Sequence, residues 1–164
     1  MPVKIWPEDR YREVVADLIT EFDLWPVVFG GPEDRDRGDR LLRSWRRGYN
    51  GAGALSLRSS ASALARCRLY LGNDSGVMHL AAAAGVPCVA LFSARESPGS
   101  WYPYGGAHRV LRSQIDCEGC MLVECIDRRM ECLMAISTAE AFEACTQIIL
   151  GVSRPDAGMP APRS

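Results

Sequence analysis

The sequence has no apolar run long enough to span a membrane, and no secretory signal peptide opens it. The formal net charge over its 164 residues is only −1, which argues against a surface built mainly for nucleic acid or anionic lipid. It contains no visible internal repeat. Its seven cysteines occur without an export signal, which indicates a reducing compartment. We therefore expect a cytoplasmic protein that does not have nucleic acid as its partner.

The residues that are present suffice for one folded domain. Hydrophobic residues make up 48% of the chain, enough to bury a substantial core. From residue 151 onward the chain is rich in Pro, Gly, Ala and Ser, a composition typical of a disordered tail. We expect one domain over residues 1–150 and a disordered tail over residues 151–164.

Helix and strand signals alternate along the domain. Helices are expected at 7–22, 33–47, from Ser59 or Ser60 to 66, 74–85 and 138–149, and strands at 25–29, 54–57, 69–71, 89–92 and 108–111. Ser137 and Glu140 have the spacing of a capping box before the last helix. The alternation predicts an α/β fold with a Rossmann-like, doubly wound parallel sheet. Ligands of such sheets bind at the carboxyl ends of the strands.

The segment 69–92 predicts a strand, a tight turn, a short helix and a second buried strand. Asp74 is a suitable N-cap for that helix, and Ser75 and Gly76 then lie in its first turn. The N–H groups of that turn have no intrahelical acceptors, so together with the helix dipole they can bind phosphate. His79 follows one turn later. The alternative is that Asp74 only caps the helix and His79 is a hydrogen-bonded core histidine.

These residues resemble a family signature. The similarity rests on Asn73-Asp74-Ser75-Gly76-x-x-His79, the Leu-Ala-Ala-Ala run that follows, Gly85, Pro87 and the strand 89–92. This pattern is similar to glycosyltransferase family 9, which contains the ADP-heptose:lipopolysaccharide heptosyltransferases. The resemblance extends from Lys4 to about Gln147 and implies the C-terminal half of a glycosyltransferase B fold. That half binds the nucleotide-sugar donor, which by resemblance is ADP-heptose, and needs no further cofactor.

The resemblance also implies donor-binding residues. Lys4 begins a Lys-x-Trp-Pro element whose lysine contacts the donor phosphate, where a cation would neutralise a diphosphate leaving group. Glu33, with Asp34 as the alternative, lies in the loop whose acidic residue accepts hydrogen bonds from ribose. Either could instead be only an acidic residue at a helix N-terminus, and Lys4 an ordinary exposed lysine. The candidate donor-binding residues are therefore Lys4, Glu33, Asp74, Ser75, Gly76 and His79.

Two parts of the family pattern are absent from this sequence. Family members have a strand and a phosphate loop just before Lys-x-Trp-Pro, and a preceding acceptor-binding domain that carries the acidic catalytic base. We therefore assign no catalytic residue and expect a donor-binding domain that transfers no sugar by itself. A glycolipid or lipopolysaccharide core acceptor would be bound by the missing domain. Self-association or a partner chain is expected, with a peripheral place at the inner face of the membrane as an additional expectation.

Two segments leave alternatives open. Cys117, Cys120, Cys125 and Cys132 lie close enough for a tetrahedral zinc site, although their spacing is not that of a zinc ribbon or a plant-type ferredoxin. Reduced structural thiols are favoured because no second Cys-x-x-Cys is present, and we assign no metal ligand. The loop 93–106 could border the sugar, but local packing of its aromatic residues is favoured. The alternative functions are a non-catalytic nucleotide-binding or interaction domain and a cysteine-clustered metal-binding module.

Overall fold

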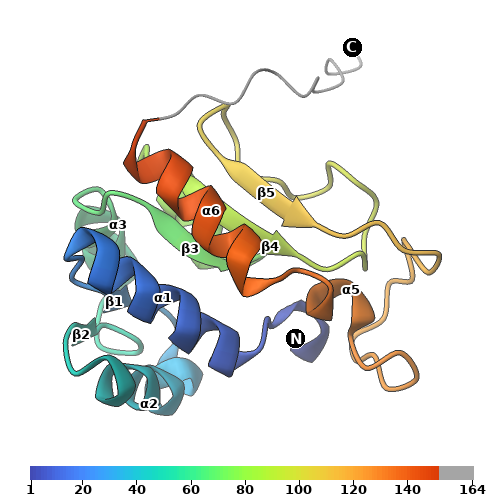
Figure 1. Cartoon of the computed structure of the whole chain (residues 1–164), viewed down its shortest axis with the longest axis horizontal. Coiled ribbons are helices and arrows are strands. Elements are labelled where there is room, and N and C mark those ends of the chain that lie inside the picture. The colour runs from blue at the N-terminus through green and yellow to red at the C-terminus, as the bar shows by residue number, and fades with distance from the viewer. Residues whose placement is uncertain (152–164) are drawn as a thin grey trace.

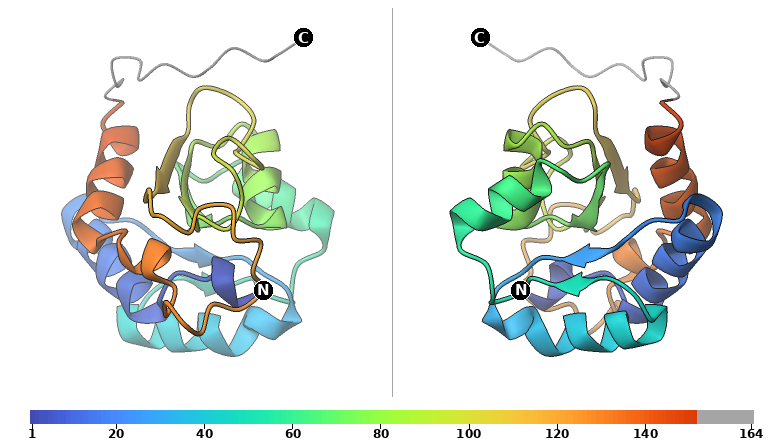
Figure 2. Two further views of the ribbon diagram at one scale, coloured as in Figure 1. Left: turned by 90° about the vertical axis from the view of Figure 1, so that its right-hand side faces the viewer. Right: turned by 90° about the vertical axis from the view of Figure 1, so that its left-hand side faces the viewer.

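The structure is a computed structural model that describes residues 1–151. Its elements are η1 (Pro2–Lys4), α1 (Glu8–Phe22), β1 (Val27–Val28), η2 (Pro32–Asp34), α2 (Arg35–Trp45), β2 (Tyr49–Asn50), α3 (Leu57–Leu64), β3 (Tyr70–Asn73), α4 (Gly76–Ala83), β4 (Cys88–Phe92), β5 (Arg109–Arg112), α5 (Glu131–Met134) and α6 (Thr138–Ile149). The strands lie in a central layer, with α1 and α6 on one face and α3 and α4 on the other (Figures 1 and 2). This helix–sheet–helix layering confirms the predicted Rossmann-like α/β fold.

The strands form two parallel sheets, not one continuous sheet. β1 pairs only with β2, with Val27 opposite Tyr49, while β3, β4 and β5 pair in that order. In the larger sheet Tyr70 lies opposite Cys88, and Val89 lies opposite Arg109. The sheet order thus leaves β1 and β3 each with one edge that pairs with no strand of the described chain.

β4 is the centre of the larger sheet. All five of its residues, Cys88–Phe92, are buried, and this continuous apolar run is typical of a strand covered on both faces. Gly85 has φ +78°, the left-handed conformation that ends many helices, and Pro87 follows before β4 begins. The short helix α4 therefore returns the chain beside β3, as the βαβ prediction requires.

The first and last long helices pack against each other and against the larger sheet (Figure 1). Val14 and Leu18 of α1 and Cys145 of α6 are buried in one core with Leu91 of β4. The predicted capping box of α6 is confirmed. The Oγ atom of Ser137 accepts the N–H of Glu140 at 3.1 Å, and the N–H of Ser137 donates to Oε2 of that glutamate at 2.8 Å.

The predicted strand at 54–57 is wrong, and so is the helix start at Ser59 or Ser60. The strand that follows α2 is β2, and the chain then turns directly into α3. The N-cap of α3 is Ser56, whose Oγ atom accepts the N–H of Ser59 at 3.1 Å. A serine hydroxyl at this position satisfies an otherwise unpaired helical N–H group, so the helix begins earlier than its apolar pattern suggests.

Two further points concern the ends and the surroundings of the domain. Of the predicted tail, residues 152–164 lie outside the described residues, so the tail stays a prediction. α5 lies in the cysteine segment, where no helix was predicted. No helix within residues 1–151 is both long and apolar enough to cross a membrane.

Candidate functional site

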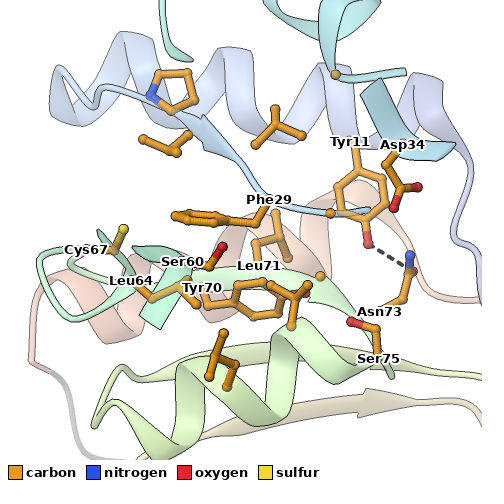
Figure 3. Close-up of a pocket in the computed structure, with 18 of the residues that line it drawn as sticks. Tyr11, Phe29, Asp34, Ser60, Leu64, Cys67, Tyr70, Leu71, Asn73 and Ser75 are labelled. Atoms are coloured by element: carbon orange, nitrogen blue, oxygen red, sulfur yellow. Dashed lines mark hydrogen bonds between the residues drawn. The ribbon is translucent and has the colours of Figure 1, made fainter. Parts of the chain in front are cut away.

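A cavity of about 1040 Å³ lies between β1 and β3 (Figure 3). Asn73 and Ser75, at the carboxyl end of β3, lie at the same end of the cavity as Asp34, which follows β1, and Cys67 lies at the other (Figure 3). This is the edge at which ligands of parallel sheets bind. Five of the six candidate donor-binding residues line this cavity: Lys4, Glu33, Asp74, Ser75 and Gly76.

The N-terminus of α4 opens onto the cavity. Its N-cap is Ser75, whose Oγ atom accepts the N–H of Met78 at 3.5 Å. Gly76 is exposed, and a Cβ atom added there would meet no other atom within 4 Å. A ligand can therefore approach the backbone N–H groups of the first turn, and the helix dipole favours an anionic one.

The predicted cap at Asp74 is wrong, because its carboxylate binds Lys4 instead. The Nζ atom of Lys4 contacts Asp74 and lies 3.4 Å from Oε1 of Glu96. A charge-assisted bond to an ammonium group is stronger than a neutral cap bond, so Asp74 turns to Lys4 and the hydroxyl of Ser75 takes the cap. The ammonium group has three donors, so a phosphate oxygen can join the two carboxylates as a third acceptor.

The two acidic residues of the loop after β1 have different surroundings. The carboxylate of Asp34 accepts the N–H of Gly31 at 3.2 Å and lies 3.6 Å from Nη1 of Arg37. Asp34 therefore has structural partners within its own turn and helix. Glu33 is exposed, and its carboxylate lies against Gly31, where an added Cβ atom would stand 2.3 Å from Oε2. Glu33 is thus the more available of the two for a ligand in the cavity.

Asn73 is a structural residue that in the sequence stands out only as part of a motif. Its Oδ1 atom accepts the hydroxyl of Tyr11 (Figure 3) and the backbone N–H of Trp6, each at 2.9 Å. Burial raises the pKa of Tyr11 well above its usual value, so the hydroxyl stays protonated and donates. The indole N–H of Trp6 donates to the carbonyl of Ile136 at 3.2 Å. These bonds hold the segment that carries Lys4 against the end of β3.

His79 does not lie with the other five candidates. It is not among the described residues that line the cavity, and its ring packs edge-on against Trp101, with ring centroids 6.4 Å apart. Within the same loop Tyr102 packs against Phe92 at 4.9 Å, which is the local packing favoured for the loop 93–106. Glu96, however, reaches Lys4, so one end of the loop borders the site.

The cysteine segment is the place where the sequence left a zinc site open. Within residues 1–151 no three His, Cys, Asp or Glu side chains are grouped so that they could hold a metal ion. All seven cysteines are free thiols, and Cys132 is buried in the core beneath the larger sheet. No described contact therefore supports the metal-binding alternative.

The comparisons with known proteins agree on one family. The model of glycosyltransferase family 9 (heptosyltransferase) matches residues 1–130. The lipopolysaccharide heptosyltransferase 2 of Salmonella typhimurium is 36% identical over 118 residues, which are 68% of this chain and 33% of that protein. The lipopolysaccharide heptosyltransferase 1 of Pseudomonas aeruginosa is 32% identical over 125 residues, 74% of this chain and 34% of that protein. The chain thus spans about a third of the length of these curated relatives.

Solved structures extend the likeness beyond the aligned sequence. The E. coli ADP-heptose lipopolysaccharide heptosyltransferase II superimposes with a TM-score of 0.75 at 29% identity, covering 92% of this chain and 43% of that one. A family 9 glycosyltransferase from Veillonella parvula also gives a TM-score of 0.75, at 28% identity, covering 92% of this chain and 44% of that one. The shared fold therefore includes nearly the whole described chain.

Proposed function

The chain belongs to glycosyltransferase family 9, and from that premise we propose that it is the donor-binding domain of a heptosyltransferase-like glycosyltransferase. The single observation that carries the proposal is the meeting of Lys4, the open backbone at Gly76 and the N-terminus of α4 at one end of one cavity. An ammonium group and unpaired N–H groups aimed at the same space suit the diphosphate of a nucleotide sugar.

Each candidate residue has a defined task in this proposal. Lys4 neutralises the diphosphate, and Asp74 holds the lysine in place. The N–H groups at Ser75 and Gly76 donate to phosphate oxygens, and Glu33 accepts hydrogen bonds from the ribose. His79, beside Trp101, is the candidate for contact with the sugar end. No cofactor besides the donor takes part.

ADP-heptose is the donor that the family membership favours. Two E. coli heptosyltransferase structures, solved with ADP and with ADP-2-deoxy-2-fluoro heptose, share the fold of this chain. In the proposed reaction an acceptor hydroxyl attacks the anomeric carbon, and the bond from that carbon to the diphosphate oxygen breaks. The bond electrons leave with the nucleoside diphosphate, whose charge the donor domain stabilises, and a base takes the hydroxyl proton.

The base and the acceptor, a lipopolysaccharide core, are assigned to a part of the enzyme that these 164 residues do not include. We therefore expect no sugar transfer by this chain alone. We also propose that it acts in the cytoplasm, at the inner face of the membrane. Trp101 and Tyr104 are 65% and 95% exposed, which favours self-association or a partner over that surface.

Substitution at Gly76 tests donor binding. Gly76→Val should weaken ADP binding at least about tenfold in calorimetric titration, because the side chain would occupy the space of the phosphate. The fold should not change, since the added atoms enter open space. The matched control is Gly106→Val, at an exposed loop glycine that also has nothing within 4 Å of its added Cβ atom. Equal ADP affinity in both variants would contradict the assigned site.

A transfer assay separates the glycosyltransferase from a non-catalytic nucleotide-binding domain. Transfer of radiolabelled heptose from ADP-heptose to a lipopolysaccharide core should be absent with this chain and should appear once a family 9 acceptor domain is added. General-base catalysis and acceptor positioning each contribute large rate factors, the former about 10² to 10⁴. ADP binding without transfer in the combined assay would favour the non-catalytic alternative. Sugar transfer by this chain alone would refute the assignment of the base and the acceptor site to another domain.

A further inference from the structure

Glu96 has no task in the proposed function, although it contacts the lysine assigned to the donor phosphate. Its Oε1 atom lies 3.4 Å from Nζ of Lys4, and it also accepts a hydrogen bond from Nη1 of Arg95. The side chains of Lys4, Glu96 and Arg95 are 19%, 18% and 11% exposed. Water and salt screen charges less in such surroundings than at an open surface. The charge of Glu96 therefore acts on any anion that Lys4 binds.

The cysteine segment holds Glu96 in place. The Nε atom of Arg95 donates to the carbonyl of Leu122 at 2.6 Å, and the N–H of Met121 donates to the carbonyl of Arg95 at 3.0 Å. From β5, Nη2 of Arg112 donates to the carbonyl of Glu96 itself at 2.7 Å. The backbone and the charged partner of Glu96 are thus both fixed, and its carboxylate is a fixed negative charge beside Lys4.

The charges around Lys4 leave little surplus for an anion. Asp74 and Glu96 place two carboxylates on one ammonium group, and Arg95 adds a second cation through its pair with Glu96. These four side chains together have no net charge. Beyond them, the N-terminus of α4 contributes the partial positive charge of a helix dipole. Such a site binds an anion of low charge at less cost than one of high charge, because each added negative charge is repelled by the fixed carboxylates.

A nucleotide sugar and a free nucleoside diphosphate differ in charge at the phosphate that bears the sugar. In the nucleotide sugar this phosphate is a diester, which carries a single negative charge. In the free diphosphate it is a monoester, whose second ionisation lies at about pH 6, so that well above this pH it carries about two negative charges. The difference is the charge that remains on the leaving group when the sugar departs.

We propose that Glu96 is a specificity-determining residue of the donor site, which makes the site favour a nucleotide sugar over the free nucleoside diphosphate. The inference rests on the proposed function, which supplies the ligand. Lys4 and the N-terminus of α4 attract both ligands, whereas the carboxylate of Glu96 repels the more highly charged one more strongly. This repulsive element gives selectivity for the donor and favours release of the product.

ADP and its methyl ester on the terminal phosphate form a matched ligand pair, because they differ by one charge and one methyl group. Calorimetric titration of the full chain at about pH 8 gives the ratio of their affinities. In Glu96→Gln the preference for the ester over ADP should fall at least about threefold, mainly because ADP binds more tightly. The amide keeps an oxygen acceptor for Lys4 and removes only the charge. ADP-heptose in place of the ester should show the same fall.

Further variants separate charge from support of Lys4. If Glu96 only positioned Lys4, its loss would weaken ADP and the ester alike, and the ratio would stay that of the parent. Glu96→Ala, which removes charge and acceptor together, should instead lower the preference for the ester as far as Glu96→Gln does. The matched control is Glu118→Gln, which removes the same charge from a carboxylate that pairs with Arg112. It should leave the ratio unchanged.

Arg95 provides a test in the opposite direction, which also decides the question if the Glu96 variants fail to fold. Arg95→Gln removes the cation that pairs with Glu96, so the carboxylate repels ADP more strongly. The preference for the ester should then rise at least about threefold. Arg95→Lys keeps the positive charge and should remain close to the parent.

The possible failures are distinguishable. An unchanged ratio in Glu96→Gln and Arg95→Gln, with both ligands bound, would overturn the selectivity of Glu96 and leave the donor site standing. Weaker binding of both ligands to Glu96→Gln at an unchanged ratio would overturn it too, and would show that Glu96 only positions Lys4. If neither ADP nor its ester binds the parent chain, the proposed donor site is refuted, and the role of Glu96 with it.

Discussion

The two sheets of this domain have the same strand direction but differ in how completely they are enclosed. β4 has a strand on each side and all its residues are buried, whereas both residues of β1 are only half-buried. β1 has a strand on one side and the cavity on the other. The comparison shows that burial of a parallel strand depends on its neighbours at both edges as much as on its own apolar residues.

The largest expected effect is on the free energy of unfolding, for two leucines on neighbouring strands of the larger sheet. Leu91 on β4 is fully buried, while Leu71 on β3 packs against the same core but also lines the cavity. Leu91→Ala should lower the free energy of unfolding by about 3–5 kcal/mol, and Leu71→Ala by about 1–2 kcal/mol. Urea denaturation of the two variants measures both values. Equal losses would contradict the view that the β3 edge is incompletely packed.

A smaller difference in stability is expected between the alanine variants of two asparagines, each of which lies at the end of a strand. Asn73 ends β3 and accepts from Trp6, whose side chain is fully buried, and from Tyr11. Asn73→Ala should cost about 2 kcal/mol, because it leaves these donors without a partner away from water.

The matching residue of the smaller sheet is Asn50, at the end of β2. Its amide N–H groups donate to the exposed carbonyl of Arg35 at 2.9 Å and to Asp39 at 2.7 Å, and its Oδ1 atom accepts the N–H of Ala52 at 3.1 Å. Asn50→Ala should cost about 1 kcal/mol, because water can replace the partner at the exposed contact with Arg35. Thermal unfolding of both alanine variants is the measurement, and a larger loss at Asn50 would reverse the ranking.

The smallest effect concerns the cap of α6, the helix that covers the larger sheet. The Ser137 N–H and hydroxyl hydrogen-bond the Glu140 carboxylate and lower its pKa. A lowered pKa stabilises the fold above the unfolded pKa, about 4.3, and this contribution is lost as the pH falls through the folded value. Between about pH 6 and pH 3 the Tm of the parent should therefore fall more than that of Glu140→Gln. Ser137→Ala should cost about 0.5 kcal/mol at neutral pH. Parallel Tm curves for parent and Glu140→Gln would contradict the linkage.

The elements that the sequence predicted well are those with local signals. The α6 cap depends on two residues three apart, and the buried strand β4 on a run of adjacent apolar residues. The predicted strand at 54–57 failed because Ser56 caps α3, a polar contact that an apolar pattern does not report. At the site, the sequence could not show that Ser75, and not Asp74, caps α4. That outcome depends on the contact of Asp74 with Lys4, 70 positions away in the chain.

The sequence by itself therefore determined the α/β class, the βαβ unit, the family resemblance and the phosphate-suited first turn of α4, since each follows from residues close together in the chain. Only the tertiary structure decided that Lys4 is held between Asp74 and Glu96, that His79 faces Trp101, and that β1 and β3 enclose a cavity. These features depend on which distant segments meet. Such meetings are set by packing of the whole domain, and no local spacing encodes them.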